Sequence, residues 1–324
     1  MLEVASPKYP MAMGFSYQPR FCSTGLRLYP LLVALVLCSL YFMSPRIYQS
    51  QQKKYCKHRN ESKIEWCHEN RLWANSSRPR VALVSYPGSG NTWMRYLLQQ
   101  STGILTGSVF PDPSLKKGGF GEGINNRSVI VVKTHNIGIT RNKGKFDRAV
   151  LLVRDPFDAI LATFNLIQSY DDSKSHIGHA TEDKFHGKGW SSFAKNYVPG
   201  CSSFECFAKK EVKRWTELNM SCLNLFKKRQ QHLIAISYED LIQNPEKELS
   251  KVLHFLGIKI SDESMRCAID CKEGIHHRSK NKTVSSSIYS SEVAQVIKSE
   301  KVKVYHKLGL PYPLSAEEIL KKLL

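Results

Sequence analysis

Residues 80–93, RVALVSYPGSGNTW, decide the fold class of this 324-residue chain. RVALVSY has the apolar, β-branched pattern of a buried strand, and the TWMRYLLQQ run after the small-residue turn is typical of a helix. A strand that passes through a glycine-rich turn into a helix is the opening unit of an α/β domain. Small residues let a backbone approach a phosphate, and the N–H groups at the helix start attract negative charge. An ordinary turn with a helix cap is the alternative interpretation of the same pattern.

The alternation of strands and helices continues along the chain. Three more buried strands are predicted, at SVIVVKT (128–134), RAVLLVR (148–154) and HLIAISY (232–238). Helices are predicted over 157–167, 204–226, 245–258 and 291–308. A long mobile insertion rich in Gly, His, Lys and Ser is predicted over 171–203. The pattern predicts an α/β fold with a parallel sheet flanked by helices, over residues 79–324.

An uncharged apolar run, residues 28–45, lies near the N-terminus between Arg27 and Arg46. Its eighteen residues are near the minimum for a bilayer-spanning helix, and a tyrosine stands near each end. A cleavable signal peptide is the alternative, but about 27 residues precede the run and no A-x-A-like site follows it. We therefore predict a cytosolic tail over 1–27, one transmembrane signal anchor over 28–45 and a stem over 46–78.

The segment after the apolar run has features of a lumenal domain. It carries five glycosylation sequons, at Asn60, Asn75, Asn126, Asn219 and Asn281. It also holds seven cysteines, which would mostly pair in an oxidising compartment and leave at least one unpaired. We expect a single-pass type II membrane glycoprotein with disulfide bonds, and the Golgi membrane as its location. The Cys and His spacings are irregular, so no metal site is predicted.

The formal net charge of +19 favours anionic partners such as nucleotide phosphates, a membrane surface or acidic glycans. A generally basic solvated surface is the alternative. Nucleic-acid binding is not predicted, because the basic residues are dispersed and a lumenal domain does not meet nucleic acid.

Three further motifs follow predicted strands. VVKTH (131–135) places Lys133 and His135 at a strand's carboxyl end, where open α/β sheets bind ligands. A histidine there can take the proton of an attacking alcohol, and a lysine can stabilise negative charge on a leaving group. VRDPFD places Arg154 at a strand end before a helix, which suits bidentate phosphate binding. The third motif, ISYEDL, is a strand followed by a turn.

In this order and spacing, the four motifs resemble those of sulfotransferases that use PAPS (3′-phosphoadenylyl sulfate), and the resemblance covers roughly residues 80–310. YPGSGNTW (86–93) is similar to the family's phosphosulfate loop, Y-P-K-S-G-T-T-W. KTH, VRDPFD and YEDL are similar to its catalytic, 3′-phosphate and adenine-side segments. The resemblance implies the sulfotransferase fold, a P-loop-like parallel sheet, with PAPS as donor, PAP as product and no metal.

The resemblance also implies roles for individual residues. His135 would be the general base, and Lys133 would stabilise the transition state. The loop residues would hold the phosphosulfate end of PAPS, namely Gly88, Ser89, Gly90, Asn91 and Thr92. Trp93 and Tyr238 would lie by the adenine, Arg154 would bind the 3′-phosphate, and a late basic segment with Arg278 and Lys280 would close over it. A basic surface loop is the alternative for that last segment.

Two positions depart from the family's pattern. The loop lysine falls on Gly88, and the serine of the 3′-phosphate motif falls on Ala162, with Thr163 one residue later. Lys133 would then partly replace the missing cation, and Thr163 would supply the hydroxyl if the helix starts slightly differently. The departures favour a second hypothesis, a non-catalytic membrane-anchored protein that binds a glycan or a nucleotide. A third, a nucleotide or sugar kinase, lacks the Walker A lysine.

Within the superfamily the chain is most similar to the sulfotransferase-like domain of WSC-domain-containing (WSCD) proteins, although no Cys-rich WSC module precedes it. That similarity implies a glycan acceptor, with sialic acid as one candidate. The predicted function is an enzyme, a sulfotransferase that moves a sulfuryl group from PAPS in line to a hydroxyl of a glycan or another secretory-pathway acceptor. The oligomeric state is not predicted.

Overall fold

The computed structural model describes residues 64–74, 77–136, 146–171, 200–226, 232–274 and 288–312. The predicted tail, the anchor, most of the stem and most of the segment 171–203 lie outside these residues. So do five predicted site residues, Asn60, Asn75, Arg278, Lys280 and Asn281. Among the helices that are described, none is long and apolar enough to cross a membrane.

Six parallel strands form one sheet in the order β3-β2-β4-β1-β5-β6. The strands are β1 (Val81–Ser85), β2 (Gly107–Ser108), β3 (Gly121–Glu122), β4 (Val132–Thr134), β5 (Arg148–Val153) and β6 (Leu233–Ser237). Strand β1 lies inside the sheet, and its residue Ala82 pairs with Val132 on one side and Ala149 on the other. All five residues of β1 are buried, as expected of a parallel strand with both faces covered. The predicted parallel sheet is confirmed.

The described helices are α2 (Asn91–Thr102), α3 (Pro113–Lys117), α4 (Pro156–Asp171), α6 (Phe204–Phe226), α7 (Tyr238–Gln243), α8 (Pro245–Leu256), α9 (Asp262–Asp270) and α10 (Ser291–Leu308). Local sequence sets several of their ends. Gly103 ends α2 in the left-handed conformation and donates its N–H to the carbonyl of Gln99. Ser290 caps α10 by accepting the N–H of Val293.

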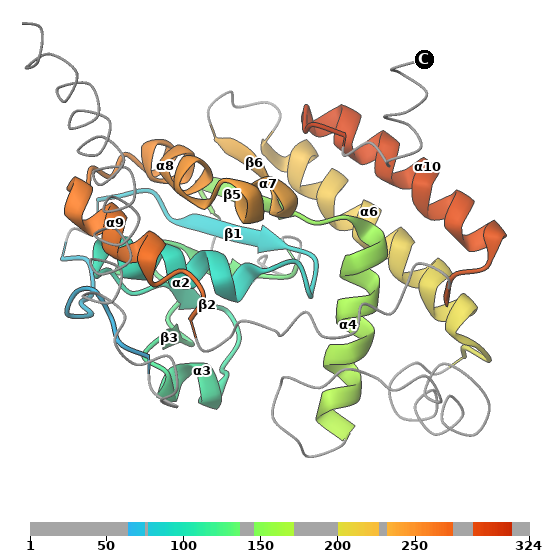
Figure 1. Ribbon diagram of the computed structural model, residues 1–324, viewed down its shortest axis with the longest axis horizontal. Coiled ribbons are helices and arrows are strands. Elements are labelled where there is room, and N and C mark those ends of the chain that lie inside the picture. Colours follow the sequence, from blue (N-terminus) through green and yellow to red (C-terminus); the bar gives the residue numbers. More distant parts are fainter. Residues whose placement is uncertain are drawn as a thin grey trace, which may run out of the picture. The chain divides into compact units, whose positions relative to one another are not determined.

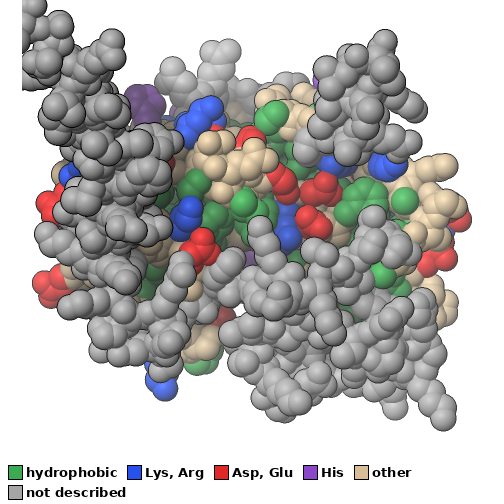
Figure 2. Space-filling view, viewed as in Figure 1, with side chains coloured by type: hydrophobic (Ala, Val, Ile, Leu, Met, Phe, Trp, Pro, Cys, Tyr) green, Lys and Arg blue, Asp and Glu red, His purple; other side chains and the backbone are tan. Residues whose placement is uncertain are grey.

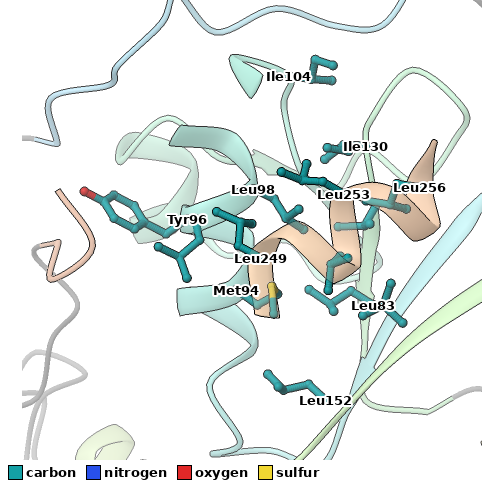
Figure 3. Close-up of a cluster of buried hydrophobic side chains, with 14 of the residues drawn as sticks. Leu83, Met94, Tyr96, Leu98, Ile104, Ile130, Leu152, Leu249, Leu253 and Leu256 are labelled. Atoms are coloured by element: carbon teal, nitrogen blue, oxygen red, sulfur yellow. The ribbon is translucent and has the colours of Figure 1, made fainter. Parts of the chain in front are cut away.

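The two faces of the sheet bury different sets of side chains. On one face, Leu83 and Leu152 pack against α2 and α8, where Met94 and Leu249 are fully buried (Figure 3). On the other, alternate residues of β1 pack against α6 and α10, whose Trp215 and Tyr305 are fully buried. These two helices lie side by side (Figure 1). Burial of each large apolar side chain contributes about 1.5–3 kcal/mol, so both helix layers are anchored to the sheet.

Residues 64–74 belong to the folded domain. Trp66 packs against the cluster on the α2 face, and Cys67 forms a disulfide with Cys267, 200 residues along the chain. The predicted stem over 46–78 therefore extends too far, because the end of that segment is tied into the core. The sulfur of Cys271 lies within 4.8 Å of this disulfide and is itself disulfide-bonded, so the three sulfurs offer no thiolate for a metal ion.

The other described cysteines and sequons divide between surface and core. Cys201 and Cys206 form a second disulfide, and Cys222 is unpaired and buried. The sequon residue Asn126 is exposed. Asn219 is 1% exposed and donates its Nδ2 to the carbonyl of Trp215 at 2.8 Å. A glycan on that side chain is incompatible with this packing, so the prediction of glycosylation at Asn219 is wrong.

Basic and acidic side chains are interspersed on the face shown in Figure 2, where the described residues do not gather into one basic patch. A protein that binds nucleic acid electrostatically presents a basic patch or stripe. The visible part of the described surface thus carries no such feature.

Candidate active site

The turn between β1 and α2 is packed so tightly that two of its positions require glycine. Gly88 and Gly90 have φ of +74° and +86°, a left-handed conformation that glycine adopts without strain. A Cβ on Gly88 would lie 2.8 Å from the Cβ of Ala162 in α4. A Cβ on Gly90 would collide with the ring of Tyr238, the first residue of α7. The turn therefore lies directly against two helices that follow other strands.

Arg154, just after β5, holds this turn through its guanidinium group. Its Nη1 donates to the carbonyl of Gly88 at 2.8 Å, and its Nη2 lies 3.8 Å from the carboxylate of Asp158. The guanidinium also lies over the ring of Tyr238, 4.6 Å from the centroid. Its Nε is buried and has no hydrogen-bond partner among the described residues. An arginine held in this way still offers a donor to an anion.

Ala162 and Thr163 lie behind the turn. The hydroxyl of Thr163 is 2.9 Å from the carbonyl of Pro87 and 2.9 Å from that of Ala159, and its single hydrogen is shared between them. The predicted contact of Thr163 with the nucleotide is not supported, because the hydroxyl faces the back of the loop. The Thr163 hydroxyl instead hydrogen-bonds the Pro87 carbonyl of the loop.

The remaining loop residues differ in what they leave for a ligand. Ser89 is 1% exposed, and its Oγ has no partner among the residues that the structure describes. Asn91 donates both amide hydrogens inward, to the carbonyl of Leu83 and to Ser85 Oγ, each at 3.1 Å. Both amide hydrogens of Asn91 are therefore used inside the protein, and its side chain has no donor left for a ligand. The backbone N–H groups at the start of α2, from Asn91 and Thr92, stay without intrahelical partners.

The two aromatic residues expected beside an adenine lie together. The ring of Trp93 meets that of Tyr238 edge-on, with centroids 6.0 Å apart. Trp93 Nε1 donates to the carbonyl of Lys272 at 2.7 Å, which fixes the indole between α2 and the end of α9. Two aromatic rings next to the loop are able to flank a flat base.

His135 follows β4, and its ring is fixed by one hydrogen bond. Nδ1 lies 2.8 Å from the carbonyl oxygen of Ser85. Because a carbonyl only accepts, Nδ1 carries the hydrogen and Nε2 carries the lone pair. Phe110 stacks on the ring with a centroid distance of 5.6 Å. Burial and the charge of Lys133 lower the pKa of His135 to about 4, so the imidazole is neutral at pH 7 with Nε2 free to accept a proton.

Lys133 is the middle residue of β4 and lies two residues before His135 in the sequence. Burial and the nearby Arg95 lower the pKa of Lys133, whereas Glu122 and Asp112 oppose that shift. Arg95 and Glu122 form a fully buried ion pair with Nη1 and Oε1 2.5 Å apart. The surroundings of Lys133 therefore contain charges of both signs.

A cavity of about 280 Å³ opens beside the loop and His135. Its lining consists of Tyr86, His135, Asn136, Arg214, Glu217, Leu218, Ser221 and Leu225. The last five residues come from α6, where no motif was found in the sequence. This cavity has room for a small polar group, and it brings that group to the imidazole.

The chain is similar in sequence to proteins of a known family. A family model described as a sulfotransferase domain matches residues 122–307. A WSCD family member of Aedes aegypti is 40% identical over 240 residues, which cover 73% of this chain and 68% of the relative. One from Drosophila melanogaster is 40% identical over 237 residues, 72% of this chain and 67% of the relative. The crystal structure of a mouse sulfotransferase complexed with PAP is 15% identical in sequence and has a TM-score of 0.43. The alignment covers 78% of this chain and 90% of the mouse chain.

Proposed function

Because the chain belongs to the sulfotransferase family, close to its WSCD members, we propose that it transfers a sulfuryl group from PAPS to a hydroxyl of a glycan. The observation that carries the proposal is the state of His135. Its imidazole is neutral, its tautomer leaves Nε2 as a proton acceptor, and its ring lines the cavity beside the glycine-rich loop. A neutral imidazole with a free Nε2 is able to take the proton of an alcohol, although a pKa of about 4 makes it a weaker base than an ordinary histidine.

The residues around the loop fit PAPS. Two buried donors, Ser89 Oγ and Arg154 Nε, have no partner among the described residues, and an anion would satisfy both. We assign the phosphosulfate end to residues 88–92 and the 3′-phosphate to Arg154. Trp93 and Tyr238 would hold the adenine. When bound there, PAPS supplies the sulfuryl group and a phosphate leaving group.

His135 acts on the acceptor in this mechanism. Nε2 takes the hydroxyl proton while a bond forms between the acceptor oxygen and sulfur. The bond from sulfur to the phosphate oxygen breaks, and its electron pair leaves with the phosphate. The carbonyl of Ser85 keeps Nδ1–H in place throughout, so the ring presents the same atom at each turnover. A pKa of about 4 means that almost every molecule begins with Nε2 unprotonated at neutral pH.

We further propose that the domain works in the Golgi lumen on a type II anchor at residues 28–45, with sialic acid among the candidate acceptors. Two disulfides, Cys67–Cys267 and Cys201–Cys206, support an oxidising compartment. The exposed sequon at Asn126 is compatible with it.

Calorimetric titration with PAP tests the donor site directly. The full-length chain in detergent is expected to bind PAP with micromolar or tighter Kd. Arg154→Ala should weaken binding by about 10–150-fold, the equivalent of a charge-assisted hydrogen bond of about 1.5–3 kcal/mol. Arg148→Ala is the matched control, because that arginine starts the same strand and lies over Phe255. A folded sample that does not bind PAP would exclude the sulfotransferase proposal.

A second candidate function is favoured by Gly88, which brings no cation to the loop. A protein of this kind would bind the nucleotide without transfer. Tight PAP binding, with no movement of radiolabelled sulfate from PAPS to a glycan pool or to water, would select this alternative.

A further inference from the structure

Arg214 is a charged residue in the cavity that none of the sequence motifs includes. It lies on α6 and lines the cavity together with Tyr86, the first residue of the loop, and His135. It is the one cation among the described residues that form this lining. The cavity therefore brings a guanidinium, a proton acceptor and the start of the loop around one space.

One buried carboxylate holds both Arg214 and the loop. Glu211 is 4% exposed, and its Oε1 accepts from Nη1 of Arg214 at 2.6 Å. Its Oε2 accepts the hydroxyl hydrogen of Tyr86. Burial and Glu211 raise the pKa of Tyr86 well above its usual value, so the phenol stays protonated and donates. The position of the guanidinium is thereby coupled to the position of the loop.

Arg214 stays charged and keeps donors free. Burial alone would lower its pKa, but Glu211 raises it above the ordinary value for arginine. A guanidinium has five N–H donors, and one of them is used by Glu211. The side chain of Arg214 is 65% exposed, so its guanidinium is accessible from the cavity, whose lining also holds the carboxylate of Glu217.

Two other cations near the loop have charged neighbours of their own. Arg154 donates to the carbonyl of Gly88 and pairs with Asp158. Lys133 is surrounded by Arg95, Glu122 and Asp112. Neither lines the cavity. Gly88 itself has no side chain, and its contact with α4 leaves no room for one.

We propose that Arg214 is a catalytic residue that donates to a sulfuryl oxygen during transfer, and that Glu211 is the residue that positions it. The inference rests on the proposed function. The acceptor proton still goes to His135, the new bond joins the acceptor oxygen to sulfur, and the electron pair of the broken bond goes to the phosphate. Arg214 gains and loses no proton; its fixed charge stabilises negative charge in the transition state.

Hydrolysis of radiolabelled PAPS by the full-length chain tests this role without an acceptor sugar, because water takes the acceptor's place. Arg214→Ala is expected to lower kcat by about 10²–10³-fold, the usual effect of removing one such donor. The Kd for PAP should change by less than about threefold, since the residue acts on the transferred group. Arg214→Lys should keep an intermediate rate, and added guanidinium ion at low millimolar concentration should restore part of the rate of Arg214→Ala. Lys213→Ala is the matched control, an exposed cation on α6 that lines a different hollow.

Glu211→Gln separates positioning from a purely structural role. It is expected to lower kcat for hydrolysis, because the bond to Arg214 loses its charge while the glutamine amide oxygen is still able to accept from Tyr86. Combining it with Arg214→Ala should give a rate no lower than Arg214→Ala alone, because both changes act on the same Arg214–Glu211 interaction. Multiplying effects would show that Glu211 acts independently and would overturn its assignment.

The other outcomes are equally decisive. If Arg214→Ala hydrolyses PAPS at the unsubstituted rate, the inference is wrong and the proposed function stands. If it only raises the KM for a glycan acceptor, Arg214 binds the acceptor and the inference is again wrong. If the unsubstituted chain binds PAP but releases no sulfate to water or glycan, both the inference and the proposed transfer fail.

Discussion

Replacing Gly88 by alanine tests how the glycine-rich loop between β1 and α2 packs against α4. At φ of +74°, a side chain costs about 1–2 kcal/mol in backbone strain. The added Cβ would lie 2.8 Å from Ala162 Cβ and 3.1 Å from both the Ala159 carbonyl and the Thr163 nitrogen. Relief of such crowding in a packed region costs about 1–3 kcal/mol more. The expected loss of unfolding free energy is therefore about 2–5 kcal/mol.

Thermal unfolding of the full-length chain, followed by tryptophan fluorescence, measures this loss. At about 2–4 °C per kcal/mol, Tm should fall by roughly 4–20 °C. Gly309→Ala is the matched control, since Gly309 has φ of +64° but nothing within 4 Å of an added Cβ. Its loss should be the backbone cost alone, roughly 2–8 °C. Ala162→Gly should recover part of the difference in Gly88→Ala, because it removes the nearest atom.

Equal Tm losses in the two alanine variants would refute the argument, because the loop would then not rest on α4. The same packing leads to a result opposite to the one that the family pattern suggests. Gly88→Lys restores the family's lysine, yet it is expected to weaken PAP binding, since the side chain has no space in this loop conformation.

Further predictions concern the base, the core and a disulfide. His135→Ala should lower transfer from radiolabelled PAPS by about 10²–10⁴-fold with unchanged PAP affinity, and a smaller loss would exclude it as the base. Because the pKa of His135 is lowered to about 4, the rate should not follow an ordinary histidine titration near pH 6.5 and should fall only as the pH drops through about 4. The histidine takes up its proton below about pH 6.5 in the unfolded chain but only near pH 4 in the folded chain. The free energy of unfolding should therefore be highest above about pH 6.5 and should decrease as the pH falls toward 4. A thermal unfolding midpoint that stays constant between about pH 6.5 and 4 would contradict this. Arg95→Leu leaves the buried carboxylate of Glu122 without its ion-pair partner and should lower the unfolding free energy by about 3–5 kcal/mol. A negligible change in the thermal unfolding midpoint would show that the pair is solvated. Replacing both members of Cys67–Cys267 by serine should cost about 2–5 kcal/mol, and an unchanged Tm would show that this link does not stabilise the domain.

The long elements were predictable because each has one strong local pattern. The sequence predicts helices over 204–226 and 291–308, and α6 and α10 have those bounds. Short elements were missed because they are too short to show such a pattern. Strands β2 and β3 have two residues each, and they exist because they pair with neighbours in the sheet. The seven-residue apolar run 128–134 shortens to Val132–Thr134 in β4.

Three short helices, α3, α7 and α9, were also missed, although each has a capping side chain at its start. The YEDL segment was predicted as a turn, yet it forms α7, with Ser237 accepting the N–H of Asp240 at its start. Helix α9 has a similar cap, in which Ser261 accepts the N–H of Ser264. A search for capping serines would have found both helices.

The strand pattern was enough to predict that the four motifs lie close together. The four motifs follow β1, β4, β5 and β6, and the carboxyl ends of neighbouring parallel strands meet at one edge of the sheet. The α6 part was not predictable. Glu211 and Arg214 stand among alternating charged and apolar residues that suit any surface helix, and only the packing of α6 beside the loop shows that one is buried and the other lines the cavity.

The two departures from the family's pattern, Gly88 and Ala162, look independent in the sequence but touch in the structure. The Cα of Gly88 faces the Cβ of Ala162, and the Gly88 carbonyl accepts from Arg154, so the loop keeps its contact with the 3′-phosphate motif without a side chain at 88. Loss of the lysine therefore does not imply loss of the loop. It leaves position 88 without a side chain, so a cation at the transferred group has to come from another element. The cation proposed for this role, Arg214 on α6, acts on the sulfuryl group, and the carboxylate of Glu211, shared with Tyr86, is the group that holds it in place.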